Sequence, residues 1–152
     1  MEKQLRPQQR IIPARSVPGN THSAEHRGMN IDVYRLIHLA ENVAAEEMAI
    51  SNLLPQMGDF CWTDELGKIT PEFVVQILRE EGFERSTSRY PSLSHHIHQI
   101  QIADYSFPII LYQGSIIDGM HRLAKAVIEN QTAIKVKNLQ EIPQEALMQK
   151  EP

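Results

Sequence analysis

The segment Gly114–Ala126, GSIIDGMHRLAKA, combines residue types that can bind an anion. Apolar β-branched residues lead into Asp118 and Gly119, and His121 and Arg122 follow where helical spacing begins. The first turn of a helix leaves backbone N–H groups unpaired, and the helix dipole makes that end partly positive. A glycine there lets an anion approach the backbone, and an arginine can donate two hydrogen bonds to phosphate oxygens. The segment therefore predicts a phosphate-binding joint between a strand and a helix.

Three side chains at this joint have more than one interpretation. His121 can exchange a proton near neutral pH, and Lys125, one helical turn later, can place a second cation on the same side. Asp118 can cap the helix, hold Mg²⁺ through water, or orient a ribose or a side chain. Asp118 and His121 are accordingly the candidate catalytic residues. The alternative is a strand that ends at Asp118, with His121 and Arg122 as solvated helix residues.

The elements that must position this joint can be predicted from residue patterns. Apolar residues at 107–112 and 115–117 bracket Gln113 and Gly114, which is typical of a β-hairpin. A core-facing helix is predicted after Gly119 by the apolar spacing of Met120, Leu123, Ala124, Val127 and Ile128. Residues 132–137 alternate between apolar and polar types and predict a returning strand.

The rest of the chain predicts an α+β (mixed α/β) fold, a small mixed sheet with packed helices. Helical spacing begins at Ile31, with Asp32 in the first turn, and continues to about Val43. Residues 47–55 predict a short strand and a turn. Further helices are predicted over residues 70–82, capped by Thr70 and ended by Gly82, and from Ser92 or Ser94 to about Asp104. Residues 56–69 and 83–91 are predicted to be connectors.

Domain boundaries follow from where these patterns start and stop. Residues 1–30 are rich in Pro, Gly and basic side chains and predict a flexible basic leader, residues 31–142 the folded domain, and residues 143–152 a C-terminal tail. The chain has 152 residues, of which 41% are hydrophobic, enough for one domain with a core. A single cysteine, Cys61, excludes an internal disulfide and suits a reducing compartment. With no apolar run of about 20 residues and no secretory signal, we expect a cytoplasmic protein without a membrane partner.

Charge is distributed unevenly along the chain. Residues 1–30 contain five of the 15 Lys and Arg but only two of the 19 Asp and Glu, so the remainder is acidic. An acidic body argues against binding to the DNA backbone, which requires a basic face. The basic leader could contact nucleic acid or an acidic protein partner, or could simply be a solvated tail.

The segments 108–111, 114–126 and 132–136 together resemble the ParB/sulfiredoxin-like superfamily, which includes the ParB-like nuclease and N-terminal domain family. The resemblance is strongest over residues 107–137, extends more weakly over 31–82 and does not include the leader. It implies a small stand-alone domain whose Gly-x-x-Arg box binds the phosphates of ATP, ADP or CTP, with Mg²⁺. The cofactor-binding residues it implies are Gly119, Met120, His121, Arg122 and, on the same helix, Lys125, with Asp118 beside them.

Departures from the relatives narrow the expected function. Met120 occupies the position of the sulfiredoxin cysteine, and a thioether cannot replace a thiolate nucleophile, so sulfiredoxin chemistry is excluded. The segment after Arg122 is too short for the DNA-binding module of partition proteins. Free serine kinases of the superfamily have a box resembling Asp-Gly-His-Thr-Arg and an upstream carboxylate as general base, for which Glu46, Glu47 and Asp59 are candidates here. We therefore expect a nucleotide-dependent small-molecule phosphotransferase or hydrolase; the alternative is a non-catalytic regulatory or interaction module with a degenerate site.

Two other groups of residues could carry chemistry. His95 and His98 share a helix face and could approach His121 to hold a metal ion, but no further ligands have suitable spacing, so no metal site is expected. The alternative is a polar helix face with one histidine packed in the core. Phe60 and Trp62 could stack on a base, or could be core aromatics.

Overall fold

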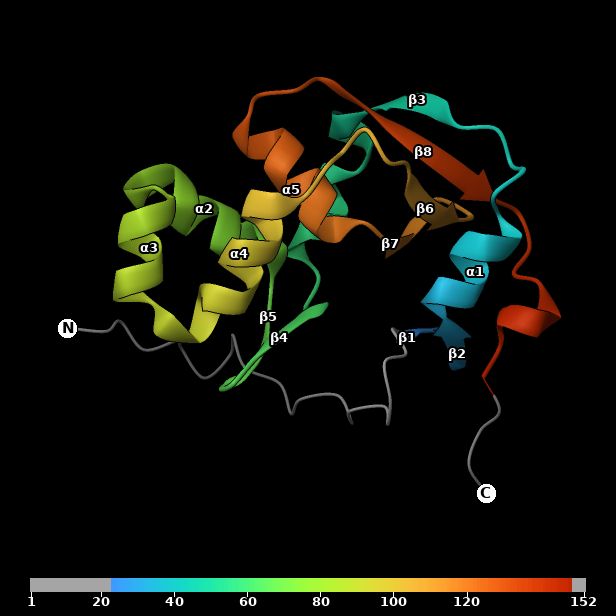
Figure 1. Ribbon diagram of the computed structural model, residues 1–152, viewed down its shortest axis with the longest axis horizontal. Coiled ribbons are helices and arrows are strands. Elements are labelled where there is room, and N and C mark those ends of the chain that lie inside the picture. Colours follow the sequence, from blue (N-terminus) through green and yellow to red (C-terminus); the bar gives the residue numbers. More distant parts are fainter. Residues whose placement is uncertain (1–22, 149–152) are drawn as a thin grey trace.

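The computed structural model describes residues 23–148, whose helices and strands are labelled in Figure 1. The strands are β1 (Ser23–His26), β2 (Met29–Asp32), β3 (Glu46–Ala49), β4 (Trp62–Asp64), β5 (Gly67–Ile69), β6 (Ile109–Tyr112), β7 (Ser115–Asp118) and β8 (Ala133–Leu139). The helices are α1 (Val33–Leu39), α2 (Pro71–Glu81), α3 (Phe83–Arg89), α4 (Ser94–Ile102) and α5 (Met120–Ile128). Short 3₁₀ turns cover Ile50–Asn52, Leu54–Gly58, Pro91–Leu93 and Gln144–Ala146. The predicted α+β class is confirmed.

A four-stranded sheet in the order β3–β8–β6–β7 positions the strand–helix joint. The predicted hairpin is confirmed: β6 and β7 are antiparallel, and Gln113 and Gly114 turn the chain with φ angles of 47° and 85°. Positive φ at both central residues matches the right-handed twist of a two-residue hairpin. The chain then crosses β6 through α5 and returns as β8, which pairs in parallel with β6. The predicted helix and returning strand are therefore also confirmed.

Strand β6 is covered on both faces, so its residues are apolar on both sides. Ile109 and Leu111 belong to the larger core cluster, which α2, α4 and α5 complete. Ile110 and Tyr112, on the opposite face, pack with the smaller cluster around Leu36 of α1. Figure 1 shows α1 on the opposite side of β6 and β7 from α5. None of the helices between residues 23 and 148 has the length and apolar character to cross a bilayer.

Helix α2 begins and ends as predicted. The Thr70 hydroxyl accepts a hydrogen bond from the Phe73 backbone N–H at 3.1 Å, and Pro71 occupies the first turn, where its missing N–H costs nothing. Gly82 ends the helix with a φ of 79°.

Two segments predicted to be connectors contain regular structure. Residues 56–69 include the β4–β5 hairpin, whose turn is closed by a 2.8 Å hydrogen bond from the Leu66 N–H to the Asp64 carboxylate. Residues 83–91 include α3, where Thr87 is hydrogen-bonded to the Phe83 carbonyl at 2.9 Å. Strands of three residues and a helix with few apolar residues are too short or too polar to show a periodic pattern in the sequence. They are stabilised by packing against the rest of the domain, which the local sequence does not reveal.

Two predicted helix starts are also wrong in detail. Ile31 lies in β2, and Asp32 caps α1 by accepting from the Arg35 N–H at 3.1 Å, so the helix spans only Val33–Leu39. Neither Ser92 nor Ser94 caps α4; Leu93 is at the cap position because a 3₁₀ turn leads directly into the helix.

The described structure extends past the predicted limits of the folded domain at both ends. Residues 23–30 of the predicted leader belong to the β1–β2 hairpin, while residues 1–22 lie outside the described part. Residues 143–148 of the predicted tail pack on the domain: Ala146 is fully buried, and the Met148 N–H donates to the Asn30 carbonyl at 2.8 Å. The two ends therefore stabilise each other through contacts between residues far apart in sequence, which local patterns do not reveal. Residues 149–152 are not described.

Candidate functional site

The joint between β7 and α5 requires glycine at position 119. Gly119 has a φ of +113° and occupies the cap position of α5. A Cβ there would lie 2.9 Å from Ile109 Cγ1 and 3.2 Å from Ile109 Cα. The backbone of the joint thus packs directly on β6, and no side chain fits between them. Asp118 is the last residue of β7 and does not cap the helix.

Arg122 ties the joint to the loop that precedes β6. Its Nη2 lies 2.5 Å from Asp118 Oδ2, and its Nη1 donates to the carbonyls of Pro108 at 2.6 Å and Phe107 at 3.3 Å. The two side chains of the ion pair are only 20% and 11% exposed. These contacts are made by Nη1 and Nη2, two of the three guanidinium nitrogens.

His121 contacts a second histidine that is buried beneath it. Its Nε2 lies 2.9 Å from Nδ1 of His96, and Nε2 of His96 lies 2.6 Å from the Thr63 carbonyl oxygen. The Trp62 ring stacks on both imidazoles, with centroids 4.7 Å from His96 and 4.4 Å from His121. His96 is 5% exposed, and burial lowers the pKa of its imidazole.

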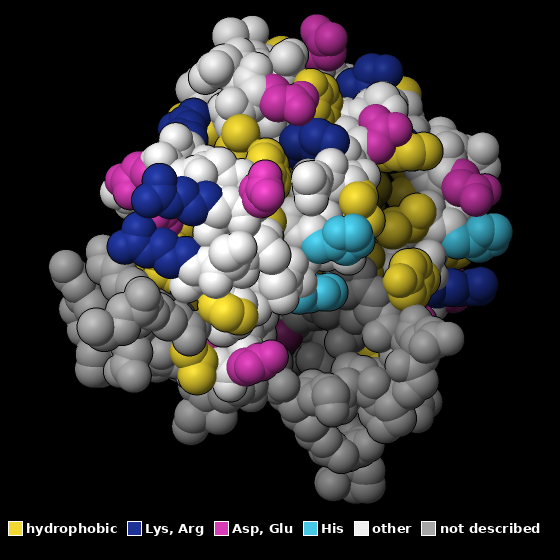
Figure 2. Space-filling model, turned by 60° about the vertical axis from the view of Figure 1, so that its left-hand side comes forward, with side chains coloured by type: hydrophobic (Ala, Val, Ile, Leu, Met, Phe, Trp, Pro, Cys, Tyr) yellow, Lys and Arg dark blue, Asp and Glu magenta, His cyan; other side chains and the backbone are white. Residues whose placement is uncertain are grey.

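A pocket of about 680 Å³ lies beside the joint. Four predicted site residues line it together: Asp118, Gly119, His121 and Arg122. Figure 2 shows a hollow on one face of the molecule, with hydrophobic side chains in it and histidine side chains beside it. The joint is therefore accessible from a concave surface of a size that accommodates a small molecule.

Apolar side chains also line this pocket, and two of them are more than half exposed. Ile37 of α1, Ile102 of α4 and Phe107 line it, and Ile102 and Phe107 are 59% and 64% exposed. The lining also includes the charged residues Glu41, Asp104 and Lys137. A ligand with one apolar part and one polar part matches this division.

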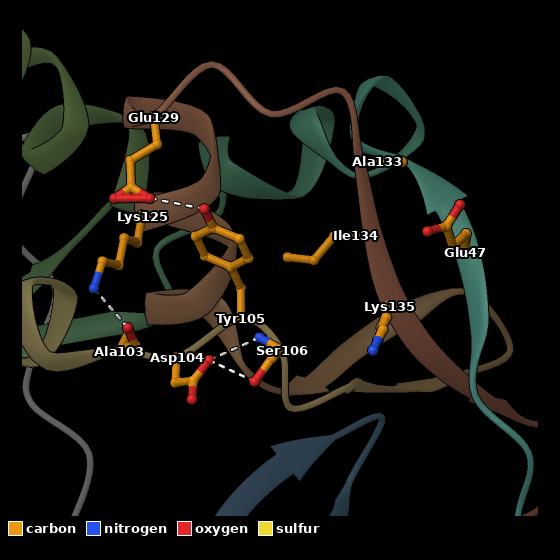
Figure 3. Close-up of a pocket in the computed structure, with 10 residues that line it drawn as sticks. All are labelled: Glu47, Ala103, Asp104, Tyr105, Ser106, Lys125, Glu129, Ala133, Ile134 and Lys135. Atoms are coloured by element: carbon orange, nitrogen blue, oxygen red, sulfur yellow. Dashed lines mark hydrogen bonds between the residues drawn. The ribbon is translucent and has the colours of Figure 1, made fainter.

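Met120 and Lys125 lie away from the pocket. Met120 packs against the larger core cluster. The ammonium group of Lys125 donates to the carbonyls of Gln101 at 2.9 Å and Ala103 at 2.7 Å. Lys125 instead lines a second pocket of about 510 Å³, shown in Figure 3.

Polar groups in the second pocket are largely paired with one another. Tyr105 donates to Glu129 at 2.7 Å, which raises the pKa of the Tyr105 phenol. Two hydrogen bonds from Ser106 lower the pKa of Asp104. Figure 3 shows these pairs on the side of the pocket opposite Glu47. This pocket shares only Lys125 with the predicted site.

The histidines of α4 are divided between the surface and the core. His95 and His98 are exposed, whereas His96 shares the buried face with Leu93, Ile97 and Ile100 and reaches His121. Among residues 23–148, no group of three His, Cys, Asp or Glu side chains is placed to hold a metal ion. Trp62 is 6% exposed, which confirms the interpretation as a core aromatic.

The carboxylates predicted as general bases do not line the pocket of the joint. Glu46 and Glu47 lie on β3, with Glu47 at the second pocket, and Asp59 follows a 3₁₀ turn. Glu41 and Asp104 line it instead, and sequence patterns alone did not identify them. His96 had a usable signal, because its spacing from Leu93 and Ile100 places it on the buried side of α4.

Comparison of the chain with protein-family models, with curated proteins and with solved structures found no match.

Proposed function

We propose that the chain is a ParB/sulfiredoxin-like domain that binds a nucleotide or another phosphorylated small molecule in the pocket beside Asp118, Gly119, His121 and Arg122. The observation that carries this proposal is the pocket itself, which is lined by those four residues and by apolar side chains. The order of elements supports it as well, since a hairpin, a glycine joint, a helix and a returning parallel strand follow one another as in the superfamily.

The apolar and the polar residues that line the pocket suit the two ends of such a ligand. A flat, apolar group can pack on Phe107 and Ile102, which are exposed and gain burial from it. The phosphate end then faces the first turn of α5, the guanidinium of Arg122, and His121.

The charged residues that line the pocket define what must accompany the phosphates. The acidic ones are Glu41, Asp104 and Asp118, and the basic ones are Arg122 and Lys137, so acidic and basic groups are nearly balanced. A nucleotide that carries Mg²⁺ is less negative than a bare nucleotide and fits this balance better. Asp118, paired with Arg122, then orients the guanidinium, and His121 is the candidate proton carrier.

A second candidate function is favoured by the hydrogen bonds of the basic residues. Arg122 donates to two backbone carbonyls and Lys125 donates to two others, so both cations stabilise the loop at residues 101–108. A domain in which these groups only maintain the fold would be an interaction module with a degenerate site.

The test is a calorimetric titration of ATP, ADP, CTP and GTP, each with and without Mg²⁺. The wild type is compared with Arg122→Gln and with Lys135→Gln, a matched loss of an exposed cation at the other pocket. Circular dichroism first establishes that each variant is folded.

We expect one nucleotide to bind the wild type and Lys135→Gln equally, and Arg122→Gln at least tenfold more weakly. If the wild type binds none of the nucleotides at millimolar concentration, the nucleotide proposal is contradicted. The interaction module is then the candidate function that remains. Binding that Lys135→Gln weakens and Arg122→Gln preserves would assign the ligand to the other pocket.

A further inference from the structure

A line of hydrogen bonds runs from the core to the pocket through two histidines. Its inner end is the Thr63 backbone carbonyl, 2.6 Å from Nε2 of His96. Its outer end is His121, whose Nε2 lies 2.9 Å from Nδ1 of His96 and whose side chain lines the pocket. His96 makes both contacts while 5% exposed, so water has little access to either.

The chemistry of these atoms determines where the protons are. A carbonyl oxygen only accepts, so Nε2 of His96 must carry a hydrogen. In a neutral imidazole the other nitrogen is then an acceptor, and Nδ1 of His96 accepts from His121. Nε2 of His121 must therefore carry a hydrogen too, and the nitrogen of His121 that gains or loses a proton is Nδ1.

The surroundings keep both rings in this orientation. Trp62 stacks on both, with interplanar angles of 13° and 11°, which fixes the planes of the two rings. The hydrogen bonds to Thr63 and between the two histidines fix which edge of each ring faces its partner. Burial opposes a positive charge on His96, while the nearby carboxylate of Asp64 favours one. Asp64 is 9% exposed, and its Oδ2 has no hydrogen-bond partner among the described residues.

We propose that His96 is a positioning residue that holds His121 in the Nε2–H form, so that His121 exchanges protons with a ligand in the pocket through Nδ1. A ligand O–H that loses its proton transfers it to Nδ1, and the resulting imidazolium donates more strongly from Nε2 to His96. The reverse step returns the proton to the ligand oxygen. This role for His121 rests on the proposed function, whereas the position of its protons in the free protein does not.

Other charged and titratable groups near the two histidines also affect how readily either ring gains a proton. His95 neighbours His96 on α4, and Asp64 approaches it from β4. Asp118 and Arg122 flank His121 at the joint, and Asp104 lines the same pocket. Substitutions at His96 are therefore designed to leave all five residues in place.

The experiment is long-range ¹H–¹⁵N correlation of the histidine rings in the ligand-free protein. The wild type is compared with His96→Asn, whose side-chain oxygen can still accept at the position of Nδ1, and with His96→Phe, which cannot accept. His98→Gln, an exposed change on the same helix, is the control. The wild-type spectrum decides the proposal even if a variant does not fold.

We expect His121 to be in the Nε2–H form above its pKa and to take up its second proton at Nδ1. His98→Gln and His96→Asn should retain this form, and His96→Phe should show both tautomers. A wild-type His121 that carries its proton on Nδ1, or a tautomer unchanged in His96→Phe, would overturn the proposal. Because no nucleotide is present, this result is independent of the calorimetric test.

Discussion

The carboxylate of Asp118, at the end of β7, and the guanidinium of Arg122, in α5, form an ion pair with 2.5 Å between Oδ2 and Nη2. Both side chains are largely shielded from solvent, and the same guanidinium bonds the Pro108 carbonyl at 2.6 Å. The two residues whose types most strongly suggest ligand chemistry thus also hold β7, α5 and the preceding loop together. Changes at either residue will affect stability as well as binding.

Arg122→Ala should lower the free energy of unfolding by roughly 3 kcal/mol, because it removes the guanidinium that pairs with the shielded Asp118 carboxylate and bonds the Pro108 carbonyl. Arg122→Lys should lower the free energy of unfolding by less, since an ammonium group keeps the positive charge but not the fork of N–H groups. Urea unfolding measures both. Arg85→Ala, a change of an exposed arginine on α3, is the control and should have little effect. Equal stability of Arg122→Ala and wild type would contradict the role of these contacts.

Gly119→Ala should destabilise the domain more than Gly114→Ala. Both positions have positive φ angles, +113° and +85°, but an added Cβ meets Ile109 at 2.9 Å in the first case and nothing within 4 Å in the second. We expect the free energy of unfolding, measured with urea, to fall by roughly 2–4 kcal/mol in Gly119→Ala and by about 1 kcal/mol in Gly114→Ala. Equal losses would mean that the close approach to β6 is easily relieved.

Stability should decrease on mild acidification because of His96. Burial lowers the pKa of His96 below 6.5, so protonation favours the unfolded chain. Its contribution is complete above pH 6.5 and is lost as the pH falls below that value, with a slope of at most ~1.4 kcal/mol per pH unit. Urea unfolding from pH 7.5 to 5.5 measures this slope.

Substitution isolates the residue responsible for that slope. His96→Phe should make the curve less steep between pH 6.5 and 5.5, whatever its absolute stability, whereas His98→Gln should retain the wild-type slope. A slope from His26, whose pKa is also lowered by burial, should remain in both variants. If His96→Phe has the wild-type slope as well, another group causes the loss of stability.

Cys61 should react slowly with alkylating agents, although the residue is exposed. The pKa of the Cys61 thiol is raised to about 11, mainly because the thiol is partly buried and to a lesser extent because the carboxylate of Asp59 is nearby. Since the thiolate is the nucleophile, reaction with iodoacetamide at pH 7 should be roughly a hundredfold slower than that of free cysteine. The rate should continue to rise with pH beyond pH 9, and Asp59→Asn should increase it. A rate that reaches a plateau below pH 9 would contradict the raised pKa.

Strong local signals in the sequence determined the elements around the joint. Gln113–Gly114 between apolar runs predicts a hairpin because few residues accept the positive φ angles of a tight turn, and Thr70–Pro71 predicts the start of α2 because its cap is a local hydrogen bond. The 3.6-residue period of α5 and the two-residue period of β8 likewise depend only on neighbours in sequence. The sequence also identified the four residues of the joint that line the pocket, because their types and their places after a strand and before a helix are local features: Asp118, Gly119, His121 and Arg122.

Contacts between distant segments decided the rest. The α3 helix and the β4–β5 hairpin have weak local signals, and the hairpin matters here because Trp62 and Thr63 hold His96. Leu147 pairs with Ile31 across almost the whole described chain. Which carboxylates face the pocket, and which α4 histidine meets His121, depends on how α1, α4 and α5 pack around the sheet. The residue types at the joint are thus readable from sequence, whereas their partners follow from tertiary packing, because each side chain is positioned by elements far away along the chain.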